Sequence, residues 1–477
     1  MLAVETDKGR RVLVQTDPAA LEGLHTGMKI TVSGVWGGSA ARRLQQQSTS
    51  CSGASSCFSG TITSATGARV APEPAVQAPS VIEAGNPLAG AGLPVVTNQL
   101  INPTISTLVI PIAATFSSGV ACSGTSLPTM TRADIQEEVF SELAAFGTPT
   151  VAAAFNRCSY QRSRLNMTNS NVTDIVRIPC SGTNNSGAKW TASSTCSFDD
   201  FNGMADAADT RLRQLGINLN AFRYKVYLTP PGTCDFVGQG YVGCDGSYSC
   251  RAWIGFGMWG TPQAIVHEIG HNMFMKHSGA VVNGVFDDYA DDTCTMGYCC
   301  QDRCWNTPHG WQMGWTSAVQ VNGTSLPAGS TITITVGSQS VYRTGAVRIL
   351  PATWASSTLQ PIFMGLRTKN NGDLWLEDNL KDRVHIYNSN IQHTFDPQPT
   401  RWIGSLAVGQ AYSLSAASLV VRRMPSTNSL LAVLAICRRV AGGAETQFTC
   451  TNGIDGDCNG QRGYDDVKCR TWVTAPV

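Results

Sequence analysis

The chain has 477 residues, enough for about three domains at roughly 150 residues each. Its 34 Lys and Arg residues nearly balance 33 Asp and Glu, so no basic excess is available to bind nucleic-acid phosphates or an anionic membrane. The hydrophobic content of 42% excludes general disorder, and no uninterrupted apolar run reaches the roughly 18 residues of a membrane span. We therefore expect a folded protein that neither binds nucleic acid nor spans a membrane.

The 17 cysteines indicate disulfides and an oxidising compartment, because most are scattered outside the paired spacing of zinc ribbons. We expect a secreted protein, and since the first residues lack an apolar run, we expect its signal peptide to be missing from this sequence. Setting aside Cys51 and Cys57 leaves 15 cysteines, an odd number. One thiol must then be free, paired between chains, or bonded to the N-terminal segment.

Four Asn-x-Ser/Thr triplets are candidate glycosylation sites if the chain enters the secretory route. Their asparagines are Asn166, Asn171, Asn184 and Asn322.

Three segments differ in their patterns. Residues 1–98 begin with alternating strands at 11–15 and 28–34 and continue from Gln45 as a Ser-, Gly-, Ala- and Pro-rich linker. Residues 99–328 mix helices and strands, and residues 329–477 contain short β segments that favour a β-sandwich-like domain. The predicted strands are 106–113, 174–178, 222–228, 252–257, 331–336, 346–350, 383–387 and 430–436, and the predicted helices are 131–146, 198–215 and 262–274. The fold class is α+β.

The segment His267-Glu-Ile-Gly-His271 lies in the last of these helices. Residues four apart share one helix face, so both imidazoles can bind one zinc ion. Glu268 then lies beside the metal, where it can accept a proton from water and return it to the leaving amine of a peptide bond. A chance occurrence of this motif is the weaker explanation.

His277 is the expected third ligand, and it requires the helix to end and the chain to turn back after His271. The usual motif, His-Glu-x-x-His-x-x-Gly-x-x-His, has glycine at the break, because glycine tolerates a positive φ. Phe274 occupies that position here, so either the break shifts, for example to Asn272, or the geometry is looser. His309 is the nearest rival ligand, although its surroundings favour a packed turn.

Met296 lies in the turn 291–298, about twenty residues after the third histidine, where it can form an apolar floor beneath the metal. Tyr298 follows two residues later and could stabilise the oxyanion, weakly ligate zinc, or simply pack. Four nearby cysteines, Cys294, Cys299, Cys300 and Cys304, are expected to staple the adjoining wall rather than form a second zinc site. Cys51 and Cys57 are expected to form a small disulfide loop, with a zinc-capping thiolate as the alternative.

The long histidine motif and the methionine turn resemble the metzincin zinc endopeptidases. The segments His267–Asn272, Tyr289–Gly297 and Trp305–Trp315 resemble the gametolysin (autolysin) family of volvocine green algae. The resemblance implies a metzincin-like domain with a mixed twisted sheet and an active-site helix over residues 99–328, and a removable pro-region over 1–98. It also implies a secreted protease that digests hydroxyproline-rich glycoproteins of the cell wall or extracellular matrix.

Near the C-terminus, Asp455, Asp457 and Asn459 occupy alternate positions before a glycine, and Asp466 lies where an EF-hand-like loop has its bidentate acid. Two interpretations stay open: a disulfide-stapled calcium loop and a solvated Asp/Asn/Gly turn.

We therefore predict a monomeric, secreted zinc metalloendopeptidase of the matrix, cell wall or periplasmic space, with calcium as a second metal if the C-terminal loop binds it. The alternative is an inactive or latent zinc-containing glycoprotein that binds matrix. A peptidase of intracellular substrates is disfavoured by the cysteine content.

Overall fold

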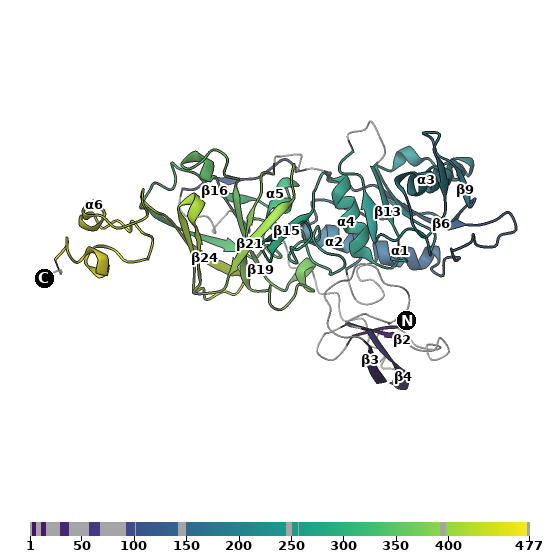
Figure 1. Cartoon of the computed structure of the whole chain (residues 1–477), viewed down its shortest axis with the longest axis horizontal. Coiled ribbons are helices and arrows are strands. Elements are labelled where there is room, and N and C mark those ends of the chain that lie inside the picture. The colour runs from purple at the N-terminus through teal and green to yellow at the C-terminus, as the bar shows by residue number, and fades with distance from the viewer. Residues whose placement is uncertain are drawn as a thin grey trace. The chain divides into compact units, whose positions relative to one another are not determined.

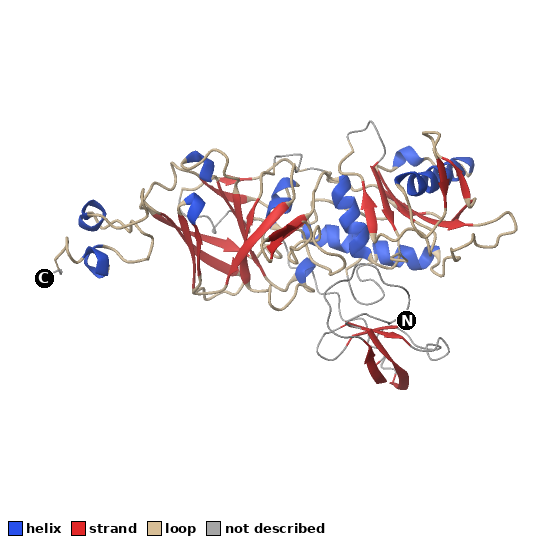
Figure 2. Ribbon diagram, viewed as in Figure 1, coloured by secondary structure: helices blue, strands red, loops and turns tan. Residues whose placement is uncertain are grey.

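The structure is a computed structural model that describes residues 2–5, 11–15, 29–37, 57–66, 92–100, 102–141, 149–244, 250–255, 257–391 and 397–474. The chain divides into two compact units, one made of residues 1–78 and 143–148 and the other of residues 79–142 and 149–477. None of the helices in the described part has the length and apolar character needed to cross a membrane. Figure 2 shows that strands outnumber helices, and the predicted α+β class is confirmed.

The first unit contains a four-stranded sheet of order β1-β2-β4-β3. Its strands are β1 (Leu2–Glu5), β2 (Arg11–Gln15), β3 (Lys29–Gly37) and β4 (Cys57–Thr66). Strand β4 pairs with both β2 and β3. Residues 57–66, which lie in the segment predicted as a linker or exposed segment from Gln45, form strand β4 of this sheet despite their Ser- and Gly-rich composition.

In the second unit, a six-stranded sheet carries the helices around the histidine motif (Figure 1). Its strands run in parallel except for the edge strand β12, which is antiparallel to β13. The strands are β12 (Gly238–Gly240), β13 (Cys250–Ile254), β11 (Tyr224–Leu228), β6 (Thr107–Ala114), β7 (Asn171–Val172) and β8 (Val176–Ile178). A hairpin of β9 (Ser181–Thr183) and β10 (Lys189–Thr191) follows β8.

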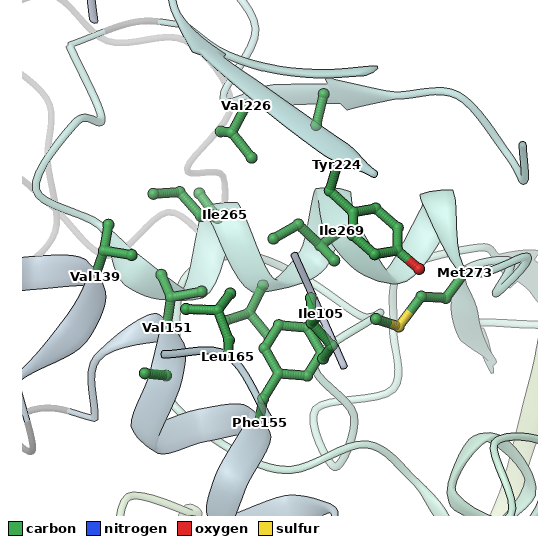
Figure 3. Close-up of a cluster of buried hydrophobic side chains, with 14 of the residues drawn as sticks. Ile105, Val139, Val151, Phe155, Leu165, Tyr224, Val226, Ile265, Ile269 and Met273 are labelled. Carbon is green, nitrogen blue, oxygen red and sulfur yellow. The ribbon is translucent and has the colours of Figure 1, made fainter. Parts of the chain in front are cut away.

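Helices cover both faces of this sheet, because alternate residues of its strands enter two separate cores. One core contains α3 (Phe198–Gln214). The other contains α1 (Arg132–Phe140), α2 (Val151–Cys158) and α4 (Pro262–Asn272), and Figure 3 shows Ile265 and Ile269 of α4 facing Val226 of β11. Buried apolar packing of this kind fixes the helix that carries the histidines.

Most elements predicted between residues 99 and 328 are present, and two differences concern the helices. Helix α1 begins after the predicted N-cap Thr131, which forms a capping box with Asp134, but ends at Phe140 rather than 146. Helix α2 was missed by the sequence analysis, although Thr150 caps its first turn.

Two further sheets follow, and one core cluster draws side chains from both. The eight-stranded sheet contains β15 (Val285–Asp287), β14 (Ser278–Val282), β21 (Thr400–Leu406), β20 (Arg383–Asn388), β19 (Ile362–Arg367), β18 (Ala346–Ile349), β16 (Ala318–Val321) and β5 (Val95–Val96). The four-stranded sheet contains β17 (Thr331–Gly337), β24 (Leu431–Arg438), β23 (Leu419–Met424) and β22 (Ala411–Leu414). Short helices α5 (Thr307–Gln312) and α6 (Gln447–Thr451) complete the elements.

One sheet contains strands from both sides of residue 328, where a domain boundary was predicted. Strands β5, β14, β15 and β16 precede residue 329, yet they share the eight-stranded sheet with β18–β21. The separate C-terminal domain from residue 329 stays a prediction, and the hydrogen bonds of this sheet cross its proposed border.

Candidate metal centre

Helix α4 presents His267, Glu268 and His271 from a buried position. Pro262 starts the helix, where its missing N–H costs nothing, and every residue of the helix is buried. Since Ile265 and Ile269 point into the core, the two histidines lie on the remaining face, with their ring centroids 4.9 Å apart.

Both helix histidines are oriented by carbonyl groups. Nδ1 of His267 lies 2.8 Å from the carbonyl oxygen of Thr295, and Nδ1 of His271 lies 2.9 Å from that of Met275. A proton on each Nδ1 can be donated to these acceptors, which leaves the Nε2 lone pair for a metal.

His277 completes the group, since ligand atoms of the three histidines lie within 4.8 Å of one another. Nε2 of His271 is 3.1 Å from Nε2 of His277. Burial lowers the pKa of His271 to about 3 and that of His277 to about 4, and it lowers the pKa of His267 well below its usual range. Three neutral imidazoles with converging nitrogens fit a zinc ion.

The helix break required by His277 occurs at the position usually held by glycine. Helix α4 ends at Asn272, and Phe274 adopts a positive φ of 68°. The aromatic ring of Phe274 lies where a Cβ on Gly243 would stand, so the absence of a side chain at Gly243 makes room for it. The break has not shifted to Asn272, whose side-chain amide instead donates to the carbonyls of two neighbouring strand ends.

Glu268 is enclosed by the edge strand. A Cβ on either Gly238 or Gly240 of β12 would collide with its side chain. Burial raises the pKa of Glu268 to about 8, and its Oε2 atom has no hydrogen-bond partner among the described residues. A buried carboxylate with an unused oxygen is suited to accept a proton from a bound water.

Met296, the residue of the predicted methionine turn, packs against helix α4. It is fully buried, and its sulfur lies where a Cβ on Gly270 would stand, so glycine at position 270 allows the turn to approach. The carbonyl of Met296 accepts a hydrogen bond from the backbone N–H of Ser278, which follows the third histidine.

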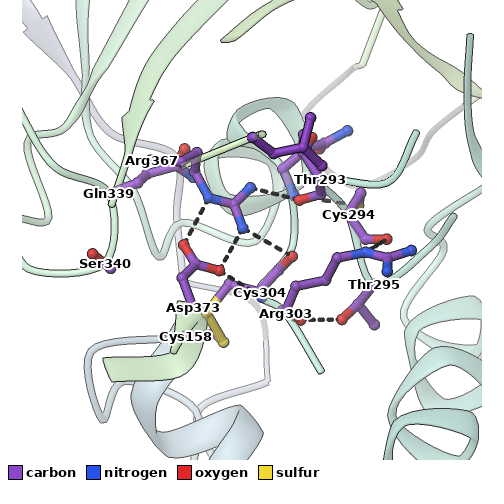
Figure 4. Close-up of polar contacts among 12 residues, drawn as sticks. Cys158, Thr293, Cys294, Thr295, Arg303, Cys304, Gln339, Ser340, Arg367 and Asp373 are labelled. Atoms are coloured by element: carbon purple, nitrogen blue, oxygen red, sulfur yellow. Dashed lines mark hydrogen bonds and ion pairs between the residues drawn. A yellow bond between two sulfur atoms is a disulfide. The ribbon is translucent and has the colours of Figure 1, made fainter. Parts of the chain in front are cut away.

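A buried ion pair is hydrogen-bonded to residues on both sides of Met296 (Figure 4). Arg367, at the end of β19, pairs with Asp373, and both side chains are essentially inaccessible to water. Arg367 also donates to the carbonyl of Thr293 at 2.6 Å, and Asp373 accepts the backbone N–H of Cys304 at 2.9 Å. A disulfide joins Cys304 to Cys158 of α2.

This ion pair is connected to the metal centre through Thr295. The backbone N–H of Thr295 donates to Cys304, and its carbonyl accepts from both Gln263 and His267. Residues beyond 329 therefore support the orientation of His267. This support for His267 could not be predicted from the sequence, because no local pattern marks Arg367 or Asp373.

Two tyrosines, Tyr289 and Tyr298, lie beside the group of three histidines. The hydroxyl of Tyr298, the predicted oxyanion stabiliser, donates to Asp287, and its ring is 5.7 Å from that of Tyr289. Tyr289 is closer to the histidines, with its ring centroid 3.9 Å from that of His277. Burial and, next, the charge of Glu268 raise the pKa of Tyr289 to about 12. Sequence analysis assigned no role to Tyr289.

Among the described residues Cys294 is free, which is one of the three alternatives that the odd cysteine count left open. It is buried, and its sulfur is 3.4 Å from Nδ1 of His309, which lies in α5 and outside the histidine group. Cys299, Cys300 and Cys304 are all in disulfides, so they do not form a second metal site, and the Cys304–Cys158 bond is the one of these that links this segment to α2. The disulfides are Cys122–Cys180, Cys158–Cys304, Cys196–Cys234, Cys244–Cys250, Cys299–Cys300, Cys437–Cys458 and Cys450–Cys469. The pairing predicted for Cys51 and Cys57 involves side chains outside the described residues.

The four residues of the predicted calcium loop lie in one turn. Asp455 accepts two backbone N–H groups of this turn, Asn459 donates to Asp466, and Asp457 pairs with Lys468. Three carboxylates lie within 4.8 Å of one another, those of Glu445, Asp457 and Asp466. Calcium binding stays a prediction, and Glu445 joins its candidate ligands.

The sequon asparagines differ in exposure. Asn166 is exposed, and Asn171 and Asn322 are partly buried. Asn184 is buried, and its side-chain nitrogen donates to Asp199 at 2.9 Å. Asn184 is therefore the least suited of the four to carry a glycan in the folded protein.

Comparison with known proteins agrees with the geometry of this centre. Residues 108–415 match the model of the gametolysin peptidase M11 family. The chain belongs to this metallopeptidase family, and the resemblance noted in the sequence is confirmed. A relative is the protein named Autolysin of Chlamydomonas reinhardtii, 26% identical over 306 residues. That alignment covers 52% of this chain and 45% of the relative, so the chain matches less than half the length of that protein.

Proposed function

We propose that this M11 family member is a zinc endopeptidase. The observation that carries the proposal is the convergence of His267, His271 and His277 beside the buried, underused carboxyl group of Glu268. Zinc held by the three imidazoles would act as a Lewis acid on the scissile carbonyl and lower the pKa of a bound water.

Glu268 is proposed as the general base. Its Oε2 atom would take the proton from the attacking water and then deliver it to the nitrogen of the leaving amine. The burial of Glu268 against β12 supports this role, because burial raises the pKa of the carboxyl group and a more basic carboxylate holds a transferred proton well.

The proposed substrates are hydroxyproline-rich glycoproteins of a cell wall or extracellular matrix. The family match and the similarity to a protein named Autolysin support this, and seven disulfides among the described residues suit secretion. Within this proposal, the metzincin-like unit acts as a monomer, residues 1–98 serve as a removable pro-region, and the segment 329–477 forms a sandwich-like domain.

The test is Glu268→Gln, which keeps the shape of the side chain but removes its basic oxygen. We expect zinc content equal to that of the wild type, measured by mass spectrometry of the purified processed protein, and a fall in kcat of roughly 10²- to 10⁴-fold on matrix glycoprotein. Glu137→Gln, at an exposed position of α1, is the matched control and should cleave normally.

Equal cleavage by Glu268→Gln and the wild type would refute the role of Glu268. Cleavage that survives complete removal of metal by a chelator would refute the zinc mechanism. A zinc-loaded protein that binds matrix but cleaves nothing would instead establish the alternative, an inactive matrix-binding glycoprotein.

A further inference from the structure

A hollow of about 320 Å³ lies on the face of the six-stranded sheet opposite α4. Its walls come from three places: the turn of the β9–β10 hairpin, the first turns of α3, and the residues beside β12 and β13. The residues used below are Asn185, Phe198, Asp206, Tyr241 and Arg251. Its volume is at the lower end of the range for small-molecule sites, about 300–1,000 Å³.

One wall is an exposed but firmly held aromatic ring. Phe198, the first residue of α3, is 61% exposed. The capping box of Ser197 and Asp200 fixes the helix start, and the rings of Phe201 and Tyr241 lie 5.4 and 6.3 Å from that of Phe198. Such a rigid ring face is available to stack on a ligand.

The opposite wall is polar but electrically balanced. Arg251 pairs with Asp206 at 2.8 Å and with Asp209 at 2.9 Å, and Asp209 also lies 3.8 Å from Arg213, so two arginines face two aspartates and the cluster has no excess charge for a strongly ionic ligand. Hydrogen-bonding groups remain, because the exposed Asn185 presents a side-chain amide to the hollow. Tyr241 is oriented by donating its hydroxyl to Asn202 at 2.7 Å.

We propose that this hollow is a carbohydrate subsite that binds a neutral pentose or hexose. An aromatic face matches the C–H face of a sugar ring, and the amide groups of the lining asparagines match its hydroxyls. Tyr241 directly follows β12, whose Gly238 and Gly240 lie against Glu268, so a bound sugar would lie at the same sheet edge as the proposed base, on the opposite face of the sheet. The assignment of that sugar to a glycosylated substrate rests on the proposed function.

Binding is tested first, with the full chain carrying Glu268→Gln so that no cleavage interferes. Arabinogalactan oligosaccharides are titrated while saturation-transfer NMR follows the sugar protons. We expect binding by the Glu268→Gln protein, and Phe198→Ala added to it should weaken binding by about tenfold or more. Phe448→Ala, which removes an equally exposed ring from α6, should bind like its parent.

Cleavage is tested second, with the active protein. The ratio of kcat/KM for glycosylated substrate to that for the same substrate after deglycosylation should fall in Phe198→Ala and not in Phe448→Ala. Failure of the oligosaccharides to bind, or equal binding by Phe198→Ala, would overturn the subsite. A glycan attached to Asn184 that covers Phe198, found by mass spectrometry, would also overturn it. Sugar binding without any peptide cleavage would refute the proposed function and leave the subsite standing.

Discussion

The Nε2 atoms of His271 and His277 lie 3.1 Å apart, but different parts of the chain position the two side chains. His271 is oriented by Met275, only four residues away. The backbone of His277 is bonded to Thr400 of β21, and His267 depends on Thr295, which is tied through Cys304 to Asp373. One side of the centre is therefore built by local helix geometry and the other by contacts with the eight-stranded sheet.

Among the substitutions on the side that depends on the sheet, Arg367→Met is expected to have the largest effect. It leaves Asp373 buried without its partner, and breaking a buried pair in this way costs about 3–5 kcal/mol. Because Thr293 and Cys304 lose their support, we expect zinc affinity to fall by about tenfold or more, measured by competition with a chromophoric chelator.

Arg251→Met is the matched control for that variant. It also removes a largely buried arginine from an acidic partner, but the side chain of Arg251 is bonded to Asp206 and Asp209 of α3, on the other face of the six-stranded sheet from the histidines. We expect a comparable loss of stability with nearly unchanged zinc affinity. Equal loss of zinc affinity in both variants would show that affinity follows global stability rather than support from the sheet.

The second prediction compares two tyrosines on the sheet-dependent side. Tyr289→Phe should lower kcat by roughly ten- to a hundredfold, because it keeps the ring that lies against His277 but removes the hydroxyl that we expect to stabilise the oxyanion. Tyr298→Phe should have a smaller effect, since its hydroxyl is bonded to Asp287. Steady-state kinetics on one peptide substrate measures both. A larger loss of kcat in Tyr298→Phe would restore Tyr298 as the oxyanion stabiliser.

These contacts show why only part of the centre could be predicted from the sequence. The spacing of His267 and His271 places them on one helix face, and a β-branched run predicted strand β6. Arg367 meets Thr293 across 74 positions, and Ser278 meets Thr400 across 122. No local periodicity encodes such distant contacts.

The same reason explains the difficulty of placing domain borders. A change from mixed helices and strands to short strands occurs near residue 329, and composition alone favours a border there. Pairing of β14 with β21 and of β16 with β18 depends on register between distant strands, which composition does not specify. Matching residues 108–415 to one family model agrees with this continuity.

A milder test of the sheet-dependent side is Thr400→Val. This change keeps the size of the side chain and the backbone N–H that binds His277, but removes the hydroxyl that contacts Ser278 and Asn306. Loss of these buried bonds should cost about 1–3 kcal/mol of unfolding free energy and lower zinc affinity a few-fold. Thr333→Val, at an exposed position of β17, should change neither. Unchanged zinc affinity in Thr400→Val would limit the role of the sheet to the Arg367 contact.

The smallest expected effect concerns the helix break at Phe274, on the side of the centre that is built by local helix geometry. Phe274 has a φ of 68°, which glycine adopts at little cost and alanine does not. Phe274→Gly and Phe274→Ala both lose the ring that packs over Gly243, so the difference between them isolates the backbone. We expect the glycine variant to be more stable by about 1 kcal/mol in urea denaturation.

Asn283, in the exposed turn between β14 and β15, supplies the control for this difference. Its φ is 52°, and it should show the same preference for glycine over alanine with no aromatic packing involved. If Phe274→Ala equals Phe274→Gly while the Asn283 pair differs, position 274 does not require a positive φ. The helix break before His277 would then be set by the sheet contact of His277 with Thr400, and both sides of the metal centre would depend on the eight-stranded sheet.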